Sequence, residues 1–144
     1  MKRIIALTAG CLLALCLTGC PMNTSQLQQT ATALDNTSIV VKDAQQAEIA
    51  AVNNGLIPPS DDLFIQQELT ALSLLGKTTD ACVLSAGNSA ATLTCIKSEL
   101  TTMNQMQTDG ALALKSDKAK STFAVVMNSA TAVVNGVYTA LGGK

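Results

Sequence analysis

The stretch that decides the fold is residues 116–141, SDKAKSTFAVVMNSATAVVNGVYTAL. Its opening pair, Ser116-Asp117, is typical of a helix start, because a serine side chain caps free amides and an acidic residue complements the helix dipole. Apolar residues then recur at spacings of three and four, at Phe123, Val126, Ala130, Val133, Val137 and Ala140. This spacing puts them on one face, so the stretch predicts an amphipathic α-helix packed against a core.

A weaker helical pattern comes first in the chain, from about residue 25 to residue 53. It ends at Asn53-Asn54-Gly55, a good C-terminal cap, and Pro58-Pro59 forbids its continuation. The apolar positions are Leu27, Ala31, Leu34, Val41 and Val52, but Ser38, Gln45 and Glu48 are expected on the same face. The core-facing stripe of this helix is therefore weak.

Two more helices are expected between these segments. The second begins at Ser60 as N-cap, has Asp61-Asp62 in its first turn to complement the dipole, and ends near residues 86–88. Its apolar residues are Ile65, Leu69, Leu72, Leu75 and Val83, interrupted by Gly76 as a close contact or a break. Ser89 can cap the third, whose apolar face is Leu93, Ile96, Leu100 and Met103, and Asp109-Gly110 indicates its end or a kink.

Four helices with short connections predict an all-α fold, a small antiparallel bundle running up-down-up-down. The β-branched runs at residues 39–41 and 133–134 would suit strands, but their surroundings favour helix and lack hairpin turns. We expect residues 25–141 to form this single bundle and residues 142–144 to fray. The sequence shows no internal repeat and no linker between domains.

The N-terminal residues have the pattern of an export signal. Met1-Lys2-Arg3 is basic, and residues 4–17 form an uncharged, mostly apolar run that is too short to span a bilayer comfortably. The run ends in Leu17-Thr18-Gly19-Cys20, which resembles the lipobox of bacterial lipoproteins. The resemblance implies that residues 1–19 are removed by cleavage between Gly19 and Cys20. It also implies that Cys20 is lipidated, which leaves residues 20–24 as a tether.

Lipidation would make the membrane a partner of the chain, through the anchor on Cys20. Two or three acyl chains hold a protein stably, and we expect no later segment to be long and apolar enough to span a bilayer. In Gram-negative lipoproteins an Asp after the cysteine favours the inner membrane, and here that residue is Pro21. We therefore expect a cell-envelope protein on the outer membrane facing the periplasm, or on the outer face of the cell membrane in a Gram-positive cell.

The remaining cysteines form a pair. Cys11 and Cys16 leave with the signal and Cys20 carries the lipid, so Cys82 and Cys95 remain in an oxidising compartment. Counted from the turn between them, they lie within about one helical turn of the same height, so a disulfide across the second hairpin is expected. Two buried free thiols or a metal site are the alternatives, although two cysteines without histidine make a poor zinc site.

Catalytic signals are lacking. The chain has no histidine, no nucleophile motif and no phosphate-binding loop, so we expect no catalytic residue, no metal and no cofactor. We expect the three glutamates, Glu48, Glu68 and Glu99, on solvated faces or paired with lysines. Met103 and Met106 form a Met-x-x-Met pair that, with Met127, could bind copper(I), but methionines commonly fill gaps in cores.

Charge and composition narrow the function further. Loss of the signal would leave 125 residues with seven lysines against ten acidic residues, a formal charge of −3 that argues against nucleic acid. The three aromatic residues, Phe64, Phe123 and Tyr138, give little for base or sugar stacking. We expect a non-catalytic interaction or structural module with an envelope protein as partner. The alternative is a carrier of a small apolar ligand or lipid within the bundle, and an enzyme is the least favoured function.

Overall fold

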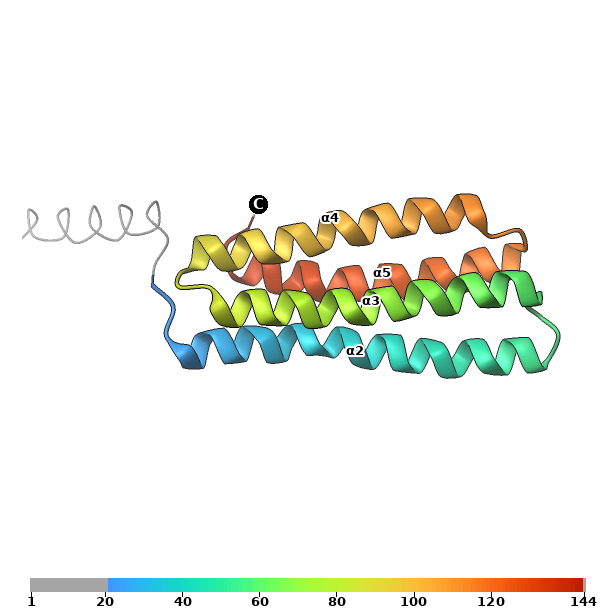
Figure 1. Cartoon of the computed structure of the whole chain (residues 1–144), viewed down its shortest axis with the longest axis horizontal. Coiled ribbons are helices and arrows are strands. Elements are labelled where there is room, and N and C mark those ends of the chain that lie inside the picture. The colour runs from blue at the N-terminus through green and yellow to red at the C-terminus, as the bar shows by residue number, and fades with distance from the viewer. Residues whose placement is uncertain (1–20, 144) are drawn as a thin grey trace, which may run out of the picture.

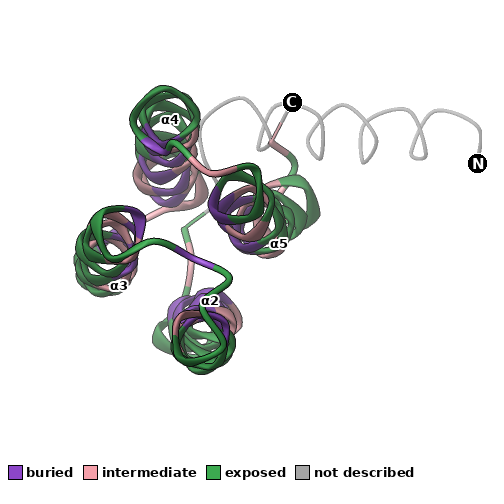
Figure 2. Cartoon of the chain, turned by 90° about the vertical axis from the view of Figure 1, so that its right-hand side faces the viewer, coloured by how far each residue is buried: buried purple, intermediate pink, exposed green. Residues whose placement is uncertain are grey.

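In the computed structural model, residues 21–143 are described and form four long helices: α2 (Thr24–Asn53), α3 (Pro59–Ser85), α4 (Ser89–Ala113) and α5 (Asp117–Ala140) (Figure 1). Neighbouring helices run antiparallel, and α2 also packs against α5, which closes the bundle (Figure 2). The predicted all-α up-down-up-down bundle is confirmed. The expected signal peptide, Cys20 and Lys144 lie outside the described residues.

The two ends of the bundle are distinct. Pro21, the connection between α3 and α4 and the last residues of α5 meet at one end, which we call the tether end (Figure 1). The connections between α2 and α3 and between α4 and α5 meet at the other, which we call the distal end.

Every helix turns a buried face towards a common core (Figure 2). In α5 that face includes Phe123, Met127, Ala130 and Val134, each at most 2% exposed. By length and composition alone, α5 is apolar enough to cross a membrane, which corrects our expectation for the later segments. Phe123, Val126 and Ala130 of the predicted stripe are instead buried against the other helices. Further along α5 Val134 is buried in place of Val133, and Ala140 is exposed.

The N-terminal cap that we predicted for α5 is present, whereas those predicted for α4 and α3 are each shifted. Ser116 caps α5 by accepting a hydrogen bond from the Ala119 amide, as predicted. The cap of α4 is Asn88, whose side chain accepts from the Ala91 amide, so Ser89 is the first helical residue instead. Ser60 is likewise inside α3, which begins at Pro59. A proline suits the first helical position because its missing N–H would have had no partner there.

The C-terminal ends of α2 and α5 share one motif. Gly55 and Gly142 have φ values of 68° and 87°, in the left-handed region that favours glycine. Gly142 donates to the Thr139 carbonyl and Gly143 donates to the Tyr138 carbonyl. Residues 142 and 143 therefore continue α5 in a hydrogen-bonded turn, whereas we expected them to fray.

Gly76 and Gly110 both lie within unbroken helices. Gly76 does not interrupt α3, and a Cβ placed on it would meet no other atom. Gly110 does not end α4, which continues to Ala113, and a Cβ placed there would collide with the Phe123 ring. The close contact that we considered for Gly76 is therefore made by Gly110.

The described part of the tether lies against the bundle. Pro21 forms an isolated β-bridge with Asn88, and the Thr92 hydroxyl donates a hydrogen bond to the Met22 sulfur at 3.4 Å. Asn23 then caps α2 in a capping box with Gln26, so the helix begins at Thr24. Residues 21–23 thus fix where the chain preceding Pro21 leaves the bundle.

Candidate functional site

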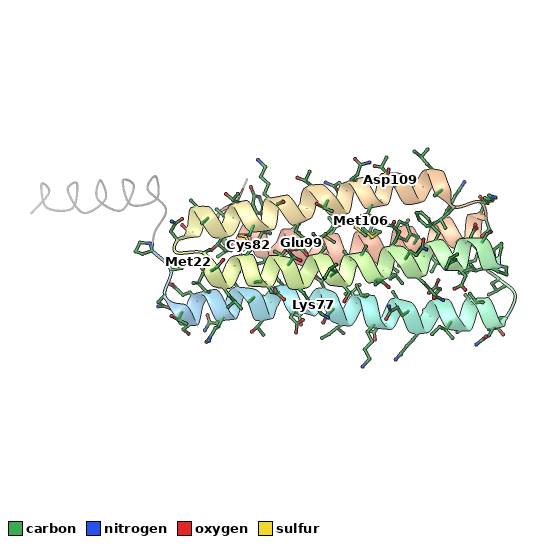
Figure 3. All side chains as sticks on the ribbon, in the orientation of Figure 1. Met22, Lys77, Cys82, Glu99, Met106 and Asp109 are labelled. Carbon is green, nitrogen blue, oxygen red and sulfur yellow. A yellow bond between two sulfur atoms is a disulfide. The ribbon has the colours of Figure 1, made fainter. Side chains whose placement is uncertain are left out.

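A disulfide joins Cys82 of α3 to Cys95 of α4, with their Cα atoms 5.9 Å apart. The predicted staple across the second hairpin is confirmed, and it lies near the tether end, as Figure 3 shows for Cys82. The closed loop spans a sequence separation of 13, and closing a loop of that size stabilises a fold by about 3 kcal/mol on chain-entropy grounds.

Two of the three glutamates are inside the bundle. Glu48 of α2 and Glu99 of α4 are each 1% exposed, so the expectation of solvated or lysine-paired glutamates is wrong for both. Neither oxygen of Glu48, and not Oε2 of Glu99, has a hydrogen-bond partner among the described residues. A carboxyl group in such surroundings holds its proton more strongly, because burial penalises the charged form.

Glu99, which Figure 3 shows inside the bundle, forms a polar layer with its neighbours Thr79 and Asp80. Burial raises the pKa of Glu99 to about 7, against the opposing effect of a hydrogen bond with the Thr79 side chain, and the Asp80 carboxylate adds to the rise. Burial also raises the pKa of Asp80, with a contribution from Asp35. The layer can therefore hold a proton near neutral pH.

A cavity of about 30 Å³ lies between α2 and α3 beside this layer. Asp35, Thr37 and Asp80 are among the residues that line it. The Thr37 hydroxyl and Oδ1 of Asp80 are buried with no hydrogen-bond partner in the described part of the chain. The cavity has room for one water molecule and polar groups to bind it, but no room for an organic substrate.

A second group of acids lies at the distal end. Burial, with a smaller contribution from the neighbouring Asp62, raises the pKa of Glu48 to about 7. Asp61 is buried and accepts hydrogen bonds from the backbone amides of Lys115 and Ser116, the latter at 2.8 Å. The Ser116 hydrogen bond is the largest of the contacts that lower the pKa of Asp61. Asp61 thus ties the start of α3 to the α4–α5 connection, in addition to its expected interaction with the helix dipole.

The methionines of the copper hypothesis serve the core. Met103 and Met127 are fully buried and Met106 is 8% exposed, all within the hydrophobic cluster. Within residues 21–143, no group of three or more cysteine, aspartate or glutamate side chains is placed to hold a metal ion. Packing therefore accounts for the methionine spacing without a ligand.

Glu68 is the glutamate that reaches the surface. It is partly buried in an open groove of about 460 Å³ between α3 and α4, which Leu74, Met106 and Asp109 also line (Figure 3). Burial raises the pKa of Glu68, and the Asp109 carboxylate contributes. The groove is shallow and acidic at one end.

Exposed leucines gather at the distal end. Leu56 in the α2–α3 connection is 53% exposed, Leu63 in the first turns of α3 is 60% exposed, and Leu112 in the last turn of α4 is 81% exposed. Ile49, near the end of α2, is also exposed. We call Leu56, Leu63 and Leu112 the distal leucines. These leucines share one end of the bundle, and exposed apolar patches typically mark interaction surfaces.

Comparisons with protein-family models, with curated proteins and with solved structures found no match to this chain.

Proposed function

We propose that the chain is a membrane-anchored bacterial lipoprotein whose helical bundle is a non-catalytic interaction or structural module of the cell envelope. The lipobox-like sequence Leu17-Thr18-Gly19-Cys20 supports the anchor, with cleavage after Gly19 and lipid on Cys20. The membrane is then one partner and an envelope protein the other. The proposed location is the outer membrane facing the periplasm, or the outer face of the cell membrane in a Gram-positive cell.

The observation that carries the interaction proposal is the position of the distal leucines. They lie at the opposite end of the bundle from Pro21, so an anchor on Cys20 would leave them directed away from the lipid. Burying a leucine side chain on a partner typically contributes about 1.5–3 kcal/mol. Three such residues, on separate elements of one end, are the apolar contacts that we assign to an envelope protein.

The interior gives the carrier alternative no support. The cavity between α2 and α3 measures about 30 Å³, whereas pockets for organic ligands are typically about 300–1,000 Å³. A non-catalytic function also agrees with a chain that lacks histidine, the commonest general base.

The anchor is tested by replacing the lipidated residue. We expect Cys20→Ala to release the protein from the membrane fraction, and metabolic labelling with a fatty acid to mark the wild-type chain alone. Pelleting of the Cys20→Ala protein with membranes to the wild-type extent would contradict the anchor.

The interaction surface is tested by photo-crosslinking in cells. A photoreactive residue at position 63 or 112 should give a discrete adduct with one envelope protein, because both side chains belong to the distal leucines. The matched control is position 94, an exposed threonine near the tether end of α4. Adducts that are identical from positions 94 and 112 would overturn the proposed surface. So would an adduct from position 112 that survives a combined Leu56→Ser and Leu63→Ser replacement.

A further inference from the structure

Among residues 21–143, no charged side chain lies at the tether end. Residues 21–34, 81–96 and 121–143 contain no Asp, Glu, Lys or Arg. These three segments are the start of α2, the α3–α4 connection with its flanking turns, and most of α5. The first two meet the C-terminal part of the third at the tether end (Figure 1). The next residue after them, Lys144, lies outside the described part of the chain.

Among the described residues, the charged side chains nearest to the tether end lie more than one helical turn from it. At a rise of 1.5 Å per residue, Asp80 lies about 8 Å from the end of α3, Lys97 about 12 Å from the start of α4, and Asp35 about 17 Å from the start of α2. The distal end is the reverse, because acidic and basic residues crowd both of its connections. These residues are Glu48, Asp61, Asp62, Asp109, Lys115, Asp117, Lys118 and Lys120.

The tether geometry brings the uncharged end towards the lipid. Pro21 is held on Asn88 and Met22 on Thr92, so only the bond from Cys20 to Pro21 separates a lipidated residue from the folded bundle. The surface around this exit consists of amide, hydroxyl and small apolar groups, including exposed Asn23, Ser25 and Thr139. Among the described residues of this end, Leu84 is the large apolar side chain that is exposed, at 51%.

We propose that the uncharged tether end is a membrane-docking surface that rests on the lipid headgroups and orients the bundle with its distal leucines away from the bilayer. The occupant is the lipid surface that receives the anchor, so the inference rests on the proposed lipidation of Cys20. Hydroxyl and amide groups can hydrogen-bond to phosphate and ester oxygens, and no charged side chain has to lose water on contact.

Charge placement suits an anionic membrane in particular. An anionic leaflet repels acidic groups within about one Debye length, which is about 8 Å at physiological ionic strength. Asp80 lies at that limit and is partly buried, and the other acidic residues lie beyond it. A bundle with net negative charge can therefore rest on such a surface without placing a carboxylate against it.

A tryptophan scan tests the orientation, because the chain contains no tryptophan. The matched variants are Leu84→Trp at the tether end and Leu112→Trp at the distal end, both replacing exposed leucines. The mature chain, from residue 20 onward, is coupled through the Cys20 thiol to a maleimide lipid in vesicles of equimolar phosphatidylcholine and phosphatidylglycerol. A nitroxide on a fraction of the headgroups quenches any tryptophan that reaches them.

We expect the Leu84→Trp protein to be quenched several-fold more strongly than the Leu112→Trp protein. Equal quenching, or stronger quenching at position 112, would overturn the docking surface. Because the coupling is chemical, this outcome is independent of lipidation in cells, and failure of the proposed anchor would appear separately in the Cys20→Ala fractionation. Unchanged helical circular dichroism checks that both variants fold.

Charge variants give an independent test in the Leu84→Trp background. Ser25→Glu with Ala90→Glu adds two carboxylates at the tether end, in the first turns of α2 and α4, where an acidic residue suits the helix dipole. The control pair, Gln67→Glu with Ser121→Glu, adds the same charge at exposed positions towards the distal end. We expect only the tether-end pair to reduce quenching on anionic vesicles, reversibly with salt. Equal loss from both pairs, or none from either, would contradict the proposal.

Discussion

At the tether end a covalent bond joins α3 to α4, whereas at the distal end a carboxylate joins α3 to the α4–α5 connection. The Cys82–Cys95 disulfide does not titrate, and within residues 21–143 no charged residue lies between it and the tether. Asp61 and Glu48 at the distal end are both buried, and the pKa of Glu48 is raised whereas the pKa of Asp61 is lowered. The tether end should therefore be sensitive to reduction and the distal end to pH.

The opposite pKa shifts set the sign of the pH dependence. Glu48 and Glu99 have pKa values raised to about 7, so the folded chain holds protons that the unfolded chain has released, and stability falls as pH rises from 4.5 to 7. Asp61 has a lowered pKa, so its contribution is present above 3.8 and is lost as pH falls below that value. Stability should be highest at about pH 4–5.

Removal of the disulfide should have the largest effect. Combined Cys82→Ser and Cys95→Ser replacement is expected to lower the free energy of unfolding by about 3 kcal/mol, because the unfolded chain regains the entropy of an open loop. Urea unfolding measures the loss. Hydrogen exchange should accelerate around the α3–α4 connection and remain unchanged around the α4–α5 connection.

Reductant supplies the control for this comparison. Dithiothreitol should destabilise the wild-type protein by the same amount and leave the double serine variant unaffected. If reduction instead loosened the two ends equally, the covalent bond would not be a local device of the tether end.

Glu99→Gln should change the free energy of unfolding by nearly as much as removal of the disulfide, but in the opposite direction and only at high pH. At pH 8 wild-type Glu99 is mostly ionised in the interior, so the neutral amide is expected to raise the free energy of unfolding by at most about 3 kcal/mol. At pH 4.5 both side chains are neutral and the difference should be small. Urea unfolding at several pH values gives the profile, and a pH-independent difference would contradict a raised pKa for Glu99.

Asp61→Asn tests the pH dependence of the distal end separately from that of Glu99. The amide keeps the shape of the side chain but loses the negative charge that accepts from the Lys115 and Ser116 amides. We expect the variant to be less stable than wild type at pH 5–8 and to lose the decline below pH 3.8, measured by the same unfolding series. A decline that persists in Asp61→Asn would assign the acid sensitivity to another carboxylate.

Local features of the fold could be predicted from sequence because neighbouring residues determine them. The spacing along α5, the Ser116 cap and the pairing of Cys82 with Cys95 each depend on contacts within a helix or one hairpin. The attachment of Asp61 to Ser116 could not be predicted in this way, because 55 positions separate the two residues and only the packed bundle brings them together.

The buried glutamates were missed for a different reason. The face of α2 that lies inside passes through Leu34, Thr37, Val41, Ala44 and Glu48 at spacings of three and four. Our expected stripe included Ser38 in place of Thr37, an error of one residue or about 100° around the helix, and Ser38 is exposed. The same stripe did contain Glu48, but we took its polar members as the sign of a weak stripe and expected the glutamate to be solvated. Its burial contradicts the general tendency of glutamate to be solvated.

Gly110 and Gly76 differ in how tightly their surroundings are packed. Gly110, near the distal end, is expected to lose about 2 kcal/mol of stability on replacement by alanine, because the new methyl group collides with Phe123. Gly76→Ala is the matched control and should gain about 1 kcal/mol, since its Cβ meets no atom and alanine favours helix. Thermal unfolding of both variants measures the difference, and effects of the same sign would contradict the packing of Gly110.

The smallest expected effect concerns two buried threonine hydroxyls that lie between the two ends. The hydroxyls of Thr37 and Thr131 are both buried without a hydrogen-bond partner among residues 21–143, but only Thr37 is among the residues lining the cavity beside Asp80. Thr131→Val should stabilise the protein by about 1 kcal/mol, because valine has the same shape and removes an unpaired polar group. Thr37→Val should gain less or nothing, because a water molecule in the cavity can satisfy that hydroxyl. Chemical denaturation of the two variants compares them directly, and an equal gain would mean that the cavity supplies Thr37 with no hydrogen-bond partner.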